Sequence, residues 1–216
     1  PTGCIAATTI TVKPLPTSVT GTFTVCAGLT TTLNSTPSGG TWTSGNVGVA
    51  TVGSSSGIVT GVAAGTVVIS YTLGTGCYAT AIVTVNPLPA AITGLNNVCT
   101  GFTIVLTDAS TGGTWTSSSS SASVGSTTGV VTGVTAGTAT ITYTLPTGCT
   151  TTTPITVNAN PTAITGTATV CVGLTTTLNS TPSGGTWSSS NPSEATVGAG
   201  TGVVTGVSAG TPTITY

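Results

Sequence analysis

The sequence predicts an all-β protein of tandem antiparallel β-sandwiches, with about seven short strands in each repeat of 72–73 residues. Three observations predict this fold class. Cysteine and tryptophan recur at a fixed interval, polar and apolar residues alternate over short runs, and glycine-rich turns separate the runs. No run has helical spacing over a useful length, so no helix is expected.

The repeat interval is carried by four series of residues. In two cysteine series and one tryptophan series, successive members are 73 and then 72 residues apart. These series are Cys4, Cys77, Cys149; Cys26, Cys99, Cys171; and Trp42, Trp115, Trp187. The tyrosine series Tyr71, Tyr143, Tyr216 has intervals of 72 and then 73. The change in length therefore falls between each Trp and the following Tyr, where a surface loop is expected.

The ends of the chain are offset from the repeats. Residues 13–86, 87–159 and 160–216 are expected to be repeats 1, 2 and 3, with repeat 3 lacking its last strand. Residues 1–12, "PTGCIAATTITV", have the pattern of such a last strand. Either the sequence is a window on a longer array, or residues 1–12 are a donor strand that completes a neighbour's open sandwich.

Strands are expected wherever apolar residues occupy alternate positions. Residues 138–143 alternate polar with apolar or aromatic side chains, and residues 79–85 place Ala79, Ala81, Val83 and Val85 on one face. An earlier strand is expected to hold Leu29, Thr31 and Leu33 in the same way. Turns are expected at residues 38–40, 61–65 and 74–76, where glycine is concentrated.

The composition excludes several functions. Lys13, Asp108 and Glu194 are the only charged side chains, and the chain has no histidine. Without a basic stripe, nucleic-acid binding is not expected. Apolar runs are far shorter than the roughly 20 residues needed to cross a bilayer, so no membrane span is expected in this segment.

No catalytic, cofactor-binding or metal site is predicted, and the chain is not expected to be an enzyme. Residues 53–57, "GSSSG", match the G-x-S-x-G pattern around Ser55, but no histidine can take the proton and the other repeats lack the pattern. Asp108 and Glu194 are solitary and occupy different places in their repeats. They therefore form neither a paired-carboxylate site nor a calcium site.

The three tryptophans are expected to lie in the core. An exposed indole could stack on a sugar, but the neighbours of each Trp alternate as in a strand and its position repeats. One Trp in the third of about seven strands is typical of an immunoglobulin-type sandwich. Trp42, Trp115 and Trp187 are therefore assigned to three sandwich cores.

Long segments of repeats 1 and 3 resemble a known family. Residues 39–71, "GGTWTSGNVGVATVGSSSGIVTGVAAGTVVISY", and residues 184–216 resemble the group 2 bacterial immunoglobulin-like repeats of intimin- and invasin-type adhesin stalks. The motifs "VCAG", "VCTG", "VCVG" and "GC" are similar to those in very long secreted surface proteins of gliding, filament-forming bacteria. The resemblance implies an extracellular or cell-surface module rather than a chemistry.

The six cysteines are expected to form disulfides, because their number is even and no histidine accompanies them as a metal ligand. Two pairings remain open. Cys26 pairs with Cys149 across repeats, or Cys26 pairs with Cys77 and Cys99 with Cys149 within repeats. Either stabilises the fold by roughly 2–4 kcal/mol per bridge. Cross-repeat pairing leaves the other cysteines needing partners in further modules.

Asn34 and Asn179 begin formal glycosylation sequons, and ordinary turn chemistry is the favoured alternative there. A nearly uncharged surface has little to oppose self-association. The sequence therefore predicts an extracellular structural protein, a rod or filament of stacked repeats that acts as a spacer or fibre in a surface appendage or matrix, with itself as partner. The alternative is an adhesin module that binds carbohydrate or a host or neighbour surface.

Overall fold

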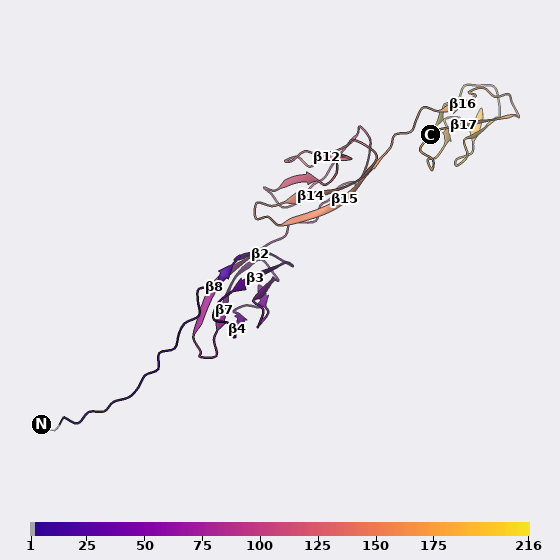
Figure 1. Cartoon of the computed structure of the whole chain (residues 1–216). Coiled ribbons are helices and arrows are strands. Elements are labelled where there is room, and N and C mark those ends of the chain that lie inside the picture. The colour runs from indigo at the N-terminus through magenta and orange to yellow at the C-terminus, as the bar shows by residue number, and fades with distance from the viewer. Residues whose placement is uncertain (1–2) are drawn as a thin grey trace. The chain divides into compact units, whose positions relative to one another are not determined.

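The structure is a computed structural model that describes residues 3–216, and its secondary structure is β throughout (Figure 1). Over this range there is no helix with the length and apolarity to cross a membrane. The chain divides into two compact units. One holds the residues up to Thr93 with residues 107–116 and 142–153, and the other holds residues 94–106, 117–141 and 154–216.

Repeat 1 forms two four-stranded sheets. Its strands are β1 (Thr20–Gly21), β2 (Thr24–Cys26), β3 (Thr30–Asn34), β4 (Thr41–Ser44), β5 (Ala50–Val52), β6 (Ile58–Gly61), β7 (Gly65–Thr72) and β8 (Tyr78–Asn86). The strand orders are β1-β3-β6-β5 and β2-β8-β7-β4. The predicted all-β sandwich is confirmed, with eight strands in this repeat.

The first segment of repeat 1 contributes one short strand to each of the two sheets. β1 pairs with β3, and after residues 22–23 the chain continues as β2, which pairs with β8. Gly21 has a φ of +130° and lies against the backbone of β3, a position that favours glycine. The pairing of β2 with β8 is parallel, whereas the other pairings in repeat 1 are antiparallel.

Alternation along the strands builds the core of repeat 1. On β8, Val83 and Val85 are buried, while Ile82, directly before Val83, points to solvent. The two sheets enclose twelve buried residues. These are Val19, Val25, Leu33, Trp42, Ala50, Val59, Val67, Ile69, Tyr71, Leu73, Val83 and Val85.

One strand of repeat 1 begins later than predicted. Leu29 was expected on the same face as Leu33, yet it lies in the turn before β3 and is 58% exposed. Its amide donates to the carbonyl of Cys26 and closes that turn. The alternating pattern therefore applies only from Thr30 onward.

Repeat 2 contains seven strands. They are β9 (Asn97–Cys99), β10 (Thr103–Val105), β11 (Thr114–Ser117), β12 (Ala122–Val124), β13 (Val130–Gly133), β14 (Gly137–Thr144) and β15 (Thr150–Asn158). The sheets have the orders β10-β13-β12 and β11-β14-β15-β9, and β9 runs parallel to β15. The loop between β11 and β12, residues 118–121, is one residue shorter than residues 45–49 of repeat 1, which accounts for the shift in the repeat interval.

Repeat 3 contains six strands. They are β16 (Thr165–Gly166), β17 (Thr175–Asn179), β18 (Ser188–Ser189), β19 (Ala195–Val197), β20 (Val203–Gly206) and β21 (Ile214–Thr215). One sheet is complete, with the order β16-β17-β20-β19, but the other is only the pair β18-β21. Residues 3–12 form no strand within this chain. Residues 1–2 of the expected last or donor strand lie outside the described residues.

Candidate functional site

Each repeat places its tryptophan against a tyrosine. The ring centroids of Trp42 and Tyr71 are 4.7 Å apart, and the pairs in the other two repeats have nearly the same separation. The indoles of Trp42, Trp115 and Trp187 are all buried. None of them is presented as a platform for a sugar.

The tyrosine hydroxyl closes the turn before the tryptophan strand. Tyr71 Oη donates to the carbonyl of Pro37 at 2.8 Å and accepts from the amide of Gly40 at 2.8 Å. A Cβ on Gly40 would lie 2.5 Å from the Tyr71 ring, so this position requires glycine. The recurring "GGTW" motif is thus explained by the tyrosine about 30 residues later.

We expect Tyr71→Phe to destabilise repeat 1 by about 1–3 kcal/mol, because it leaves the Pro37 carbonyl and the Gly40 amide without their partner. Hydrogen exchange of the β7 amides measures this effect. Tyr78→Phe, at an exposed position on β8, is the matched control and should change exchange little. Equal protection factors in the two variants would contradict the role of the hydroxyl.

The first candidate site is a disulfide between residues of two repeats. Cys26 ends β2 of repeat 1, and Cys149 lies in the hairpin between β14 and β15 of repeat 2. The two are bonded, 123 residues apart in sequence, with Cα atoms 5.7 Å apart. The within-repeat alternative, Cys26 with Cys77 and Cys99 with Cys149, is not what the structure holds, because Cys26 and Cys149 already bond each other.

Four cysteines have no partner among the described residues: Cys4, Cys77, Cys99 and Cys171. Cys99 and Cys171 occupy the place that Cys26 has in repeat 1. Cys4 and Cys77 occupy the place that Cys149 has in repeat 2. The four unpaired cysteines therefore comprise two equivalents of Cys26 and two equivalents of Cys149.

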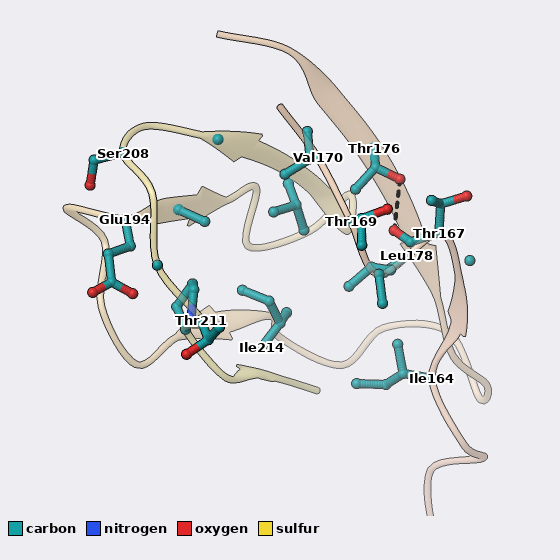
Figure 2. A pocket seen from close by; sticks show the side chains of 17 residues that line it. Ile164, Thr167, Thr169, Val170, Thr176, Leu178, Glu194, Ser208, Thr211 and Ile214 are labelled. Carbon is teal, nitrogen blue, oxygen red and sulfur yellow. Dashed lines mark hydrogen bonds between the residues drawn. The ribbon is translucent and has the colours of Figure 1, made fainter. Parts of the chain in front are cut away.

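The second candidate site is an open groove in repeat 3, with a volume of about 580 Å³. Figure 2 shows Val170, Leu178 and Ile214 around the open space, with Glu194 and Ser208 at one end. Thr176 Oγ1 donates to the carbonyl of Thr167 at 3.0 Å and fixes the segment that forms one wall. The groove is a mostly apolar channel with backbone on both sides.

The groove lies where repeat 1 has its β8. In repeat 1, β8 pairs with β2 on one side and β7 on the other. In repeat 3 the residues equivalent to β2 form no strand, and of those equivalent to β7 only Ile214 and Thr215 do. The core cluster of repeat 3 has four buried hydrophobic residues, against twelve in repeat 1.

The remaining predicted positions are dispersed. Asn34 and Asn179 are exposed at the ends of β3 and β17, and their glycosylation stays a prediction. Ser55 lies in the exposed turn between β5 and β6. No group of three His, Cys, Asp or Glu that could hold a metal occurs between residues 3 and 216.

Sequence reasoning missed the groove lining and the tyrosine hydroxyl bonds. The signal for the hydroxyl bonds was present, because Tyr71, Tyr143 and Tyr216 recur with the second glycine of "GGTW". The groove had no comparable signal, because its lining residues are spread from Ile164 to Ile214. Its depth depends on side chains from several strands and could not be derived from one segment.

Part of the chain matches a known protein family. Residues 151–216 match the family described as bacterial Ig-like domain (group 2). The resemblance stated from the sequence is therefore confirmed over that stretch. Among curated proteins, none matches the chain in sequence.

Several solved structures are similar in fold. Domains 4 and 5 of the S-layer protein SbsC match with 21% identity and a TM-score of 0.33, over 67% of this chain and 99% of that one. A C-terminal fragment of intimin, in complex with the intimin-binding domain of its translocated receptor, matches with 18% identity and a TM-score of 0.43, over 74% of this chain and 69% of that one. Mouse cadherin-23 EC22–24 matches with 13% identity and a TM-score of 0.29, over 91% and 89%.

Proposed function

Because residues 151–216 match the group 2 bacterial Ig-like domain, we propose that this chain is an extracellular structural protein. In this proposal its immunoglobulin-like repeats form a rod or filament that acts as a spacer at the cell surface. The partner of each repeat is another repeat of the same kind.

The observation that carries the proposal is the disulfide between Cys26 and Cys149. A bond between the end of β2 and the β14–β15 hairpin restrains this hairpin of repeat 2 against repeat 1. Closing a loop of this length also removes much of the conformational freedom of the unfolded chain. Both effects suit a protein that carries tension rather than one that performs chemistry.

The surface supports the same proposal. Three charged side chains in 216 residues give a net charge of −1, so little electrostatic repulsion opposes close packing of neighbouring modules. Exposed apolar side chains recur at equivalent positions. Leu29, Phe102 and Leu174 each directly follow the glycine of a "VCxG" motif. Repetition of one surface along the chain favours a spacer over a module with a single specialised tip.

Pulling the chain from its two ends tests the mechanical role. In the oxidised protein, the residues between Cys26 and Cys149 are shielded from force, so the extension on unfolding should be shorter by roughly 400 Å than in the reduced protein. Single-molecule force spectroscopy measures this difference. Cys77→Ser, which removes a thiol that is unpaired in this chain, is the control and should retain the full difference.

Equal extension in the oxidised and reduced proteins would count against the mechanical role. Saturable binding to a defined glycan on an array, lost on substitution of one exposed side chain such as Phe102, would favour the adhesin alternative. The two measurements use the same purified chain.

A further inference from the structure

Repeat 1 contains a small pocket between β3, β4 and the turn that joins β5 to β6, with a volume of about 230 Å³. Its apolar floor consists of Leu33, Trp42 and Tyr71, all buried. Its polar rim includes Asn34, Ser38, Ser55 and Ser56. The three charged side chains of the chain are not among the lining residues. The pocket thus combines an uncharged polar rim with an aromatic floor.

Hydrogen bonds fix the segments around this pocket. The amide of Trp42 donates to the carbonyl of Ser54 at 2.8 Å, which ties the β5–β6 turn to β4. The amide of Leu33 donates to the carbonyl of Gly57 at 2.9 Å, which ties the same turn to β3. The tyrosine hydroxyl bonds described above fix the turn before β4. The pocket is therefore formed before any ligand arrives, which lowers the entropic cost of binding.

Several polar groups at the pocket have no partner within the chain. Trp42 is 5% exposed, and a Cβ on Gly57 would lie 3.1 Å from its Nε1, so the N–H edge of the indole lies beside the turn. Within residues 3–216 this N–H makes no hydrogen bond, and it is not fully enclosed either. The exposed side chains of Asn34, Ser38 and Ser55 likewise make none in the described part of the chain. These groups are free to bind a ligand.

We propose that this pocket binds one ring of a neutral hexopyranose in a surface polysaccharide. The Trp42 N–H donates to an oxygen of the sugar. The Asn34 amide and the Ser55 hydroxyl, which both donate and accept, bind neighbouring sugar hydroxyls. The indole contributes its N–H edge rather than its buried face. This site goes beyond the proposed spacer function and does not depend on it.

The chemistry of the pocket favours a sugar over other ligands. An anionic or cationic ligand would lose hydration without meeting an opposite charge. A purely apolar ligand would cover the rim groups without replacing their hydrogen bonds to water. The volume is below the roughly 300–1,000 Å³ usual for drug-sized ligands, so a single ring is the appropriate size. A sugar ring offers hydroxyl groups to the rim and an apolar C–H face to the floor.

Repeat 3 provides a natural comparison within the same chain. Residues 33–42 and residues 178–187 have the same sequence, "LNSTPSGGTW". The following turn differs, because Ser55 of "GSSSG" is replaced by Gly200 of "GAGTG". Repeat 3 therefore keeps the asparagine and the tryptophan but lacks one rim hydroxyl. We expect it to bind the same sugar more weakly than repeat 1.

The test is an NMR titration of the full, oxidised chain, in which each tryptophan contributes one indole N–H signal. The probes are the neutral methyl glycosides of glucose, mannose and galactose, the neutral polysaccharide dextran, and glucuronate as a charged comparison. The indole signal of Trp42 should shift saturably with at least one neutral probe, and glucuronate should bind more weakly than methyl glucoside. No shift of the Trp42 signal with any neutral probe would overturn the proposal, and so would tighter binding of glucuronate.

A pair of substitutions separates the pocket from the rest of the surface. Asn34→Ala should weaken binding about tenfold, because it removes both a donor and an acceptor from the rim. Thr80→Ala removes an exposed hydroxyl from β8, outside the pocket, and should change binding less than about twofold. Both residues are exposed, so neither variant should alter thermal unfolding. Equal effects of the two substitutions on binding would overturn the pocket as the site.

A gain of binding in repeat 3 provides an independent measurement. A Cβ on Gly200 would meet open space, and its φ is not in the left-handed region, so Gly200→Ser should fit without strain. This variant should raise the affinity measured at the Trp187 indole about threefold, toward that of repeat 1. No gain would overturn the role assigned to Ser55. Asn34→Ala should retain the force difference between oxidised and reduced chains, so loss of sugar binding would leave the spacer function standing.

Discussion

Replacing Cys26 by serine is expected to lower the free energy of unfolding of repeat 1 by about 5 kcal/mol, which is the largest effect expected of any single substitution in the chain. Cys26 and Cys149 close a loop whose ends are 123 residues apart, and the entropy that a crosslink removes from the unfolded chain grows with the logarithm of loop length. Urea denaturation followed by hydrogen exchange of the β7 and β8 amides measures the change.

Cys171→Ser is the matched control for this prediction. Cys171 occupies the place in repeat 3 that Cys26 has in repeat 1, but it is unpaired in the single chain. In dilute, monomeric protein this variant should change stability by less than about 0.5 kcal/mol. Comparable losses in the two variants would show that the serine itself, rather than the lost bond, is responsible.

Trp42→Ala is expected to cost repeat 1 about 3–5 kcal/mol, because it leaves a large cavity between the sheets and removes the partner of the Tyr71 ring. A 74-residue sandwich has little stability to lose, so we expect its β7 amides to exchange as in an unfolded segment. Repeat 3, whose Trp187 is untouched, provides an internal reference in the same sample.

Tyr78→Ala is the control for the loss of aromatic area. Tyr78 is 63% exposed at the start of β8, so its removal opens no cavity and should cost less than about 0.5 kcal/mol. A native exchange pattern in repeat 1 of the Trp42 variant would contradict the prediction, because it would show that the core of repeat 1 is stable without the indole.

Local pattern was sufficient to predict much of the fold. Alternation in residues 79–85 and 138–143 correctly identified the buried faces of β8 and β14, because one face of each strand must pack on the core. Alternation alone placed Leu29 in a strand, yet the turn that its own amide closes onto Cys26 leaves it exposed. A short run of alternating residues does not mark where its strand begins.

Non-local features were harder to predict. The parallel pairing of β2 with β8 joins segments about 60 residues apart, and nothing within either segment signals its partner. The disulfide had the same difficulty, because periodicity gave two series of three equivalent cysteines and left both cross-repeat and within-repeat pairings open. The tyrosine bond to Pro37 was likewise set by the packing of two distant segments.

The bond between Cys26 and Cys149 also bears on how the chain would withstand proteases outside the cell. A single backbone cut at an exposed loop between these residues, such as the turn at 53–56 or the proline-containing segment 87–88, leaves the two fragments covalently attached. Such a nick would separate the pieces on a reducing gel but not on a non-reducing one. A chain crosslinked in this way stays in one covalent piece after a backbone cut that would separate the domains of a chain without the disulfide.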